Sequence, residues 1–125
     1  MLVLEVVDHV EDYFGFLRTL KQKSKWKIFH FSLDFSVKNA VLKGALLKER
    51  EKLVHLHHFN KETALRTLHD TGYEVVDWFY TPFAVNFTKG PIEKLVKPFR
   101  WMSFQINQDL AVRFLGGYRL LVLAR

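Results

Sequence analysis

Residues 3–12 read Val-Leu-Glu-Val-Val-Asp-His-Val-Glu-Asp, an apolar run that passes directly into an acidic segment with one histidine. The β-branched residues of the first half favour a short buried strand, and the polar second half indicates a loop at its end. The carboxylate of Asp12 can accept hydrogen bonds from the first backbone N–H groups of a helix that begins at Tyr13. The stretch therefore predicts a strand, a polar loop and a helix in that order.

The rest of the chain alternates between strand and helix patterns. Further strands are predicted at residues 26–33, 73–80 and 118–124. Further helices are predicted at residues 36–54, between the N-cap Asn60 and Gly72, at 91–97 before an interruption by Pro98, and at 109–115. Residues 81–90 are expected to form a loop. This alternation indicates an α/β sheet with parallel crossovers.

The composition fits one small globular domain spanning residues 1–125, because 49% of the residues are hydrophobic and 26% are charged. The chain has no Cys, which excludes disulfides, thiolate nucleophiles and Cys-based zinc sites. The N-terminus has no basic signal-peptide region, and no apolar stretch approaches the ~20 residues that a membrane-spanning helix needs. We therefore expect a soluble, cytoplasmic protein.

The formal net charge of +6 favours an anionic partner, such as nucleic acid, a lipid surface or a cofactor. Residues 21–27 combine lysines with Trp26, as nucleic-acid surfaces do, but lysines at this position also suit the C-terminal end of a helix dipole. Residues 94–101 are basic and aromatic and could touch an anionic membrane, although Pro98 interrupts a long amphipathic helix. Nucleic acid is thus a possible but less favoured partner.

Three passages, taken in order, resemble one family. Residues 5–12 resemble the E-V-L-E-H-V-E-D run that ends the fourth strand of class I S-adenosylmethionine-dependent methyltransferases of types 11, 12 and 23. The histidine-rich residues 55–60, the capped helix and Thr71-Gly72-Tyr73-Glu74-Val75-Val76 are similar to the family's H-x-x-x-F-[ST], helix and A-G-F-E-V-V passage. Residues 117–125 look like the family's last, antiparallel strand.

The resemblance implies an α/β fold, a partial Rossmann-like methyltransferase sheet that holds strands 4-5-7-6 with flanking helices. Because these four strands are neighbours in the sheet, helices could pack on both of its faces. The family's first three strands, its Gly-rich loop and its ribose-binding acidic residue have no counterpart here, and no G-x-G-x-G pattern occurs. The chain would then be the C-terminal half of the fold. Residues 36–58 and 82–108, which match poorly, would be insertions on the substrate side.

The resemblance also implies roles for particular residues. Glu5 and Val6 would lie beside the cofactor, S-adenosylmethionine, whose binding to this chain alone is expected to be weak or absent. Asp8 and His9 would be catalytic, since methyl transfer needs a nucleophile with an exposed lone pair. A simpler interpretation is that Asp8 or Asp12 only caps the next helix.

His55, His57 and His58 form a second candidate group, and we expect them to bind substrate. Histidines two apart on an extended segment share a face, as metal ligands do, but no Cys or carboxylate cluster stands beside them in the sequence. No metal site is therefore predicted, and an ordinary polar loop is the alternative.

The predicted function is that of part of a methyltransferase that acts on an O, N or C nucleophile of a small molecule and is inactive as the isolated chain. The alternative is a non-catalytic binding module or partner subunit, in contact with RNA in one version. An apolar strand 4 without its neighbour invites pairing with another chain. We therefore expect a homo-oligomer, or association with the missing N-terminal half through this edge.

Overall fold

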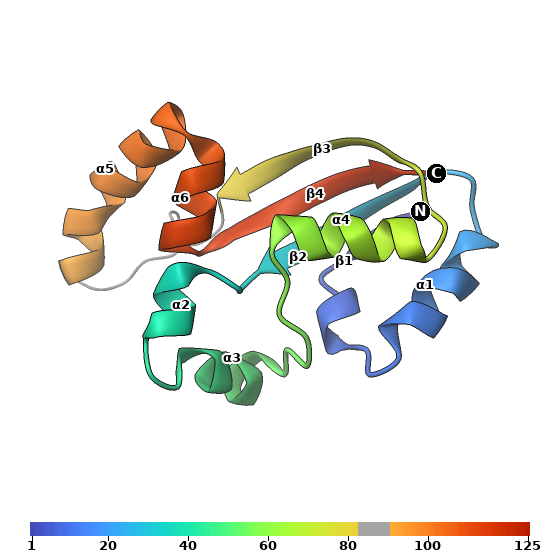
Figure 1. The fold of residues 1–125 in the computed structure, drawn as a ribbon, viewed down its shortest axis with the longest axis horizontal. Helices are drawn as coiled ribbons and strands as arrows, with labels where there is room; N and C mark the ends of the chain where they lie inside the picture. Colours follow the sequence, from blue (N-terminus) through green and yellow to red (C-terminus); the bar gives the residue numbers. More distant parts are fainter. Residues whose placement is uncertain (83–90) are drawn as a thin grey trace.

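A computed structural model describes residues 1–82 and 91–125, and its centre is a sheet of four strands (Figure 1). The strands are β1 (Leu2–Leu4), β2 (Lys27–Leu33), β3 (Val75–Pro82) and β4 (Tyr118–Ala124). They lie in the order β1-β2-β4-β3, with β1 parallel to β2 and with β4 antiparallel to both neighbours. The predicted strand order and the antiparallel last strand are thus confirmed. Residues 83–90 of the expected loop lie outside the described residues.

Six α-helices and one short 3-10 helix accompany the described strands. They are η1 (Val7–His9), α1 (Tyr13–Lys21), α2 (Val37–Val41), α3 (Ala45–Leu53), α4 (Lys61–Asp70), α5 (Pro91–Ile106) and α6 (Gln108–Leu115). The Asp12 side chain accepts a hydrogen bond from the Gly15 backbone N–H, so the predicted cap of α1 is confirmed. Asn60 caps α4, and Gly72 adopts a φ of 87° after it.

Several predicted boundaries were wrong. The strand expected at 73–80 begins and ends two residues later, as Val75–Pro82. The first strand ends at Leu4, because Glu5 turns the backbone with a φ of 52° and η1 follows. The helix expected over 36–54 is two helices, since Gly44 takes a left-handed conformation between them. Pro98 lies inside α5 instead of ending it, and beyond it Arg100 donates to the Gly116 carbonyl and Phe104 stacks on Tyr118.

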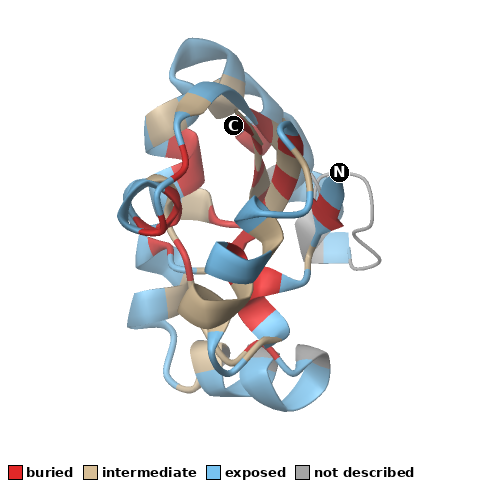
Figure 2. Cartoon of the chain, turned by 90° about the vertical axis from the view of Figure 1, so that its right-hand side faces the viewer, coloured by how far each residue is buried: buried red, intermediate tan, exposed pale blue. Residues whose placement is uncertain are grey.

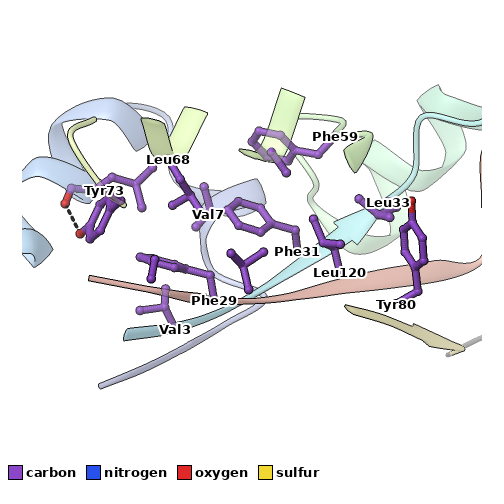
Figure 3. Packing of buried hydrophobic residues seen from close by; sticks show 14 of the residues in the cluster. Val3, Val7, Phe29, Phe31, Leu33, Phe59, Leu68, Tyr73, Tyr80 and Leu120 are labelled. Carbon is purple, nitrogen blue, oxygen red and sulfur yellow. Dashed lines mark hydrogen bonds between the residues drawn. The ribbon is translucent and has the colours of Figure 1, made fainter. Parts of the chain in front are cut away.

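The core lies between the sheet and the helices (Figure 3). Val3, Phe29 and Val122 sit opposite one another on neighbouring strands and point to the same side, because paired residues share a face of the sheet. Leu68 of α4 and Leu17 of α1 are fully buried against this side. Figure 2 shows the buried residues gathered along the strands and the inward sides of the helices.

The opposite face of the sheet carries apolar side chains that are largely exposed. Leu4 lies in one row across the strands with His30, Leu121 and Phe79, and Leu4 and Phe79 are 51% and 54% exposed. The buried cluster to which the helices contribute lies on the Phe29 side (Figure 3). The predicted flanking helices are thus present, and among the described residues they contribute their buried side chains to the Phe29 side of the sheet.

Candidate functional site

The candidate site lies where the carboxyl ends of the parallel strands β1 and β2 meet. Asp8 belongs to η1, shortly after β1, and Asp34 directly follows β2. The segment before α4 crosses this edge and is fixed to η1, because the backbone N–H groups of Leu56 and His57 both donate to the Asp8 carbonyl, at 2.8 and 3.2 Å. Ligands in open α/β sheets bind at this kind of edge.

His55 stands between two carboxylates. Its Nδ1 lies 2.5 Å from Oδ2 of Asp34, and its Nε2 lies 3.7 Å from Oδ2 of Asp8. The histidine is buried, and Asp8 is completely so. The Asp34 bond fixes the orientation of the ring, so that Nε2 faces Asp8.

Asp8 is an unusual buried carboxylate. Neither of its carboxylate oxygens has a hydrogen-bond partner among the described residues. Burying a carboxylate without hydrogen bonds is costly, so such groups in native proteins call for an explanation. The caps of α1 and α4 are Asp12 and Asn60, and η1 has no side-chain cap, so the interpretation of Asp8 as a helix cap is not supported.

His9 joins this pair from the solvent side. Its ring meets the ring of His55 edge-on, with 4.8 Å between centroids, and its Nδ1 lies 3.0 Å from the carbonyl oxygen of Val54. One ligand atom each from Asp8, His9 and His55 lies within 4.8 Å of the other two. Two imidazoles and a carboxylate in this arrangement could move protons or hold a metal ion.

The other predicted site residues have different neighbours. His57 directs Nε2 to the Val10 carbonyl at 3.0 Å and packs against Tyr13, while Nδ1 of His58 lies 3.8 Å from Oδ2 of Asp34. Among the three predicted substrate-binding histidines, His55 and His58 thus share Asp34, and His57 faces α1. Their role in binding substrate stays a prediction.

Glu5 and Val6, predicted to lie beside the cofactor, belong to another cluster. The Glu5 carboxylate forms an ion pair with Arg119 and lies 3.4 Å from Nδ1 of His30. Nε2 of His30 lies 3.0 Å from the Thr81 hydroxyl. Burial, followed by the charge of Arg119, lowers the pKa of His30 below its ordinary value. Val6 is exposed, and its carbonyl accepts from the His9 N–H at 3.0 Å.

Asp34 was missed by the sequence analysis, although a signal for it exists. It is a polar residue directly after a buried strand, at the edge where Asp8 was expected. Its partner His55 is 21 residues away in the chain, so no local spacing connects the two. Recognising it requires placing the ends of both parallel strands together.

The basic segment 21–27 is partly used by the fold itself. Lys21 donates to the Gly72 carbonyl, and Lys27 donates to the carbonyls of Lys21 and Ser24. Burial lowers the pKa of Lys27. In α5, Arg100 is buried and donates to the Gly116 carbonyl. These contacts favour structural roles for both basic segments.

Two hollows flank α6 on the described surface. The larger, of about 490 Å³, is bordered by Phe35, Val37, Asn60 and Arg113. The smaller, of about 300 Å³, lies between α5 and α6 beside Phe99 and Leu110. The larger hollow is lined in part by Ser36, Val37 and Ala40 of the first predicted substrate-side insertion.

Comparisons with known proteins identify the fold. No family model and no curated protein matches the sequence. Among solved structures, a candidate methyltransferase from Bacillus halodurans C-125 is similar with a TM-score of 0.57 and 14% identity, over 99% of this chain and 67% of that one. A SAM-dependent methyltransferase from Archaeoglobus fulgidus is similar with a TM-score of 0.54 and 13% identity, over 98% of this chain and 57% of that one.

These likenesses define the fold class: the chain has a mixed α/β, methyltransferase-like fold with one parallel strand pair and flanking helices. The chain spans about two thirds of the first neighbour's length and just over half of the second's. Among the described residues, no helix is both long and apolar enough to traverse a bilayer.

Proposed function

We propose that this chain is the C-terminal part of a SAM-dependent methyltransferase of the type 11, 12 and 23 kind, which methylates an O, N or C nucleophile of a small molecule. One observation carries the proposal: the His55 side chain lies between the carboxylates of Asp34 and Asp8 at the carboxyl ends of β1 and β2. The fold shared with two methyltransferase structures supports it.

The chain's own residues would position and deprotonate the methyl acceptor. Asp34 orients His55, whose Nε2 faces the unpaired carboxylate of Asp8, while His9 offers a second imidazole toward solvent. When the acceptor takes up the methyl group, its proton would pass to Asp8 or His9. S-adenosylmethionine, held mainly by the N-terminal part of the fold, would supply the methyl group from its sulfonium.

The hollow bordered by Phe35, Val37 and Arg113 would hold the part of the acceptor that is remote from the methylated atom, because Asp8 and His9 are not among its lining residues. This hollow is lined by α2, from the first predicted insertion, and by α6. Its lining is mainly apolar, with Ser36, Asn60 and the ion pair of Glu62 and Arg113 as polar groups, which suits a small organic molecule that carries a polar end. Residues 82–108 would complete the substrate side.

The proposed function includes a partner at the sheet. β1 lies at one end of the strand order, and Leu2 and Leu4 are 65% and 51% exposed. We propose that the N-terminal part of a methyltransferase fold, with its own strands and cofactor loop, pairs with β1 and covers the exposed face. The greater length of both structural neighbours supports this choice. The isolated chain would then be inactive.

A chimera tests the proposal. The part of the Archaeoglobus fulgidus methyltransferase that this chain does not cover is joined ahead of Met1, and S-adenosylmethionine binding is measured by calorimetry. We expect micromolar binding by the chimera. Circular dichroism first checks that the chimera unfolds cooperatively, and a folded chimera without S-adenosylmethionine binding would overturn the proposal.

A further inference from the structure

We propose that Asp8, His9 and His55 form a binding site for one divalent transition-metal ion of the zinc type. The three residues come from η1 and from the segment before α4, and their ligand atoms all lie within 4.8 Å of one another. No metal was predicted from the sequence because no carboxylate stands beside the histidines there. The fold brings Asp8 and Asp34 to His55.

Both histidines are already oriented in the way that metal ligands are. Histidines that bind metals direct their second ring nitrogen to a carboxylate or a backbone carbonyl, which fixes the tautomer and the ring. Nδ1 of His55 is bonded to Asp34, and Nδ1 of His9 is bonded to the carbonyl of Val54. Nε2 of each ring is therefore the nitrogen available for an ion.

Asp8 supplies the negative charge that such an ion requires. Its carboxylate is fully buried, and neither oxygen has a hydrogen-bond partner among the described residues. Oδ2 faces Nε2 of His55 at 3.7 Å. A cation between these atoms would replace the missing hydrogen bonds and offset the cost of burying the charge.

The three groups must move closer together to hold an ion. Zinc ligands at about 2.0–2.2 Å from the ion lie roughly 3.4 Å from one another in a tetrahedron, whereas the ligand atoms here lie within 4.8 Å of one another, with 3.7 Å between Asp8 and His55. His9 is the exposed member, so its ring can shift toward the buried His55 and Asp8. Three protein ligands leave a fourth position open to solvent, which is typical of catalytic rather than structural zinc sites.

The ligand set also selects the kind of metal. Two imidazoles with one carboxylate suit Zn²⁺ and its first-row neighbours, whereas Mg²⁺ and Ca²⁺ prefer oxygen ligands. The site does not depend on methyl transfer, because all three ligands belong to this chain and S-adenosylmethionine takes no part in it. With the ion bound, Asp8 and His9 would be its ligands and would not accept the acceptor's proton.

Calorimetric titration of the full chain with ZnCl₂, without S-adenosylmethionine, tests the proposal. We expect one equivalent to bind with a micromolar or lower Kd, and D8N or H55Q to weaken binding at least about 100-fold. D34N, which removes the support of His55 but none of the three ligands, is expected to weaken binding about 10- to 100-fold. H69Q is the matched control, since His69 is an exposed histidine of α4, and its affinity should equal that of the wild type.

Two further measurements keep the result interpretable. Thermal melts show whether each variant is folded, and Zn²⁺ should raise the Tm of the wild type but not that of D8N. Co²⁺ replacing Zn²⁺ should give the visible absorption of a four-coordinate ion, lost in H55Q. The proposal is overturned if the wild type binds no Zn²⁺, if folded D8N and H55Q bind it like the wild type, or if Mg²⁺ binds more tightly.

Discussion

Asp34 and His55 are joined by a hydrogen bond of 2.5 Å between Oδ2 and Nδ1, and it links the end of β2 to the segment before α4. Both side chains are largely shielded from solvent. A hydrogen bond to a charged carboxylate is stronger in such a shielded site than in water. It decides which way His55 faces, and through His55 it decides the shape of the candidate site.

Replacing Asp34 by Asn should destabilise the protein. D34N removes a charge-assisted hydrogen bond from a shielded site, which typically lowers the free energy of unfolding by about 1–3 kcal/mol. Urea denaturation followed by circular dichroism measures the change. Asp70→Asn is the control, because Asp70 pairs with Arg66 on the surface, where such pairs contribute less than about 1 kcal/mol. Equal effects of the two substitutions would contradict the structural role of Asp34.

Replacing Asp8 by Asn should have the opposite effect in buffer containing a chelator. The substitution removes a buried charge that lacks hydrogen bonds, so the free energy of unfolding should rise by about 1 kcal/mol. The same denaturation experiment gives the answer. A loss of stability in D8N comparable to that in D34N would show that the Asp8 carboxylate is satisfied in the native protein.

His30 should make stability depend on pH. Because burial and Arg119 lower its pKa in the folded chain from 6.5, the unfolded chain binds a proton more readily. The contribution of His30 to the free energy of unfolding is therefore fully present above about pH 6.5. It is lost as the pH falls through the pKa that His30 has in the folded chain, which is lower. Unfolding free energies of wild type and H30Q, measured from about pH 7.5 to 5, should diverge accordingly. Parallel pH profiles would refute this.

The exposed edge at β1 should cause self-association of the isolated chain. Leu4 is exposed on an end strand of the sheet, and an apolar free edge pairs readily with another chain. Light scattering at tens of micromolar should show a species larger than the monomer, and L4K should shift it to the monomer because a charged edge resists pairing. V41K is the control, since Val41 of α2 is 77% exposed away from the sheet. A monomeric wild type, or equal effects of both substitutions, would contradict the prediction.

Much of the fold could be predicted from the sequence, because the local residue patterns and the order of the elements along the chain agree with the structure. The apolar run of residues 118–124 and the alternating or apolar pattern of residues 26–33 predict strands, and the resemblance places them in the sheet. Asp12, Asn60 and Gly72 are local signals, and each acts where it was expected.

The features that could not be predicted depend on contacts between residues far apart in the sequence, or on an unusual backbone conformation. Glu5 has a positive φ, which turns its side chain to His30 and Arg119 rather than toward Asp8. Pro98 lies inside α5 although its local preference is to break a helix, and the part of α5 beyond it makes tertiary contacts through Arg100 and Phe104. The Asp34–His55 bond is likewise a tertiary contact that no periodicity encodes.

The central claim is that this chain carries the substrate side of a methyltransferase fold and depends on another polypeptide segment for its cofactor. The most direct measurement is a calorimetric titration of the isolated, folded chain with S-adenosylmethionine. We predict no detectable binding at micromolar concentrations, since the chain has no Gly-rich cofactor loop. Saturable binding with a micromolar Kd by this chain alone would contradict the account.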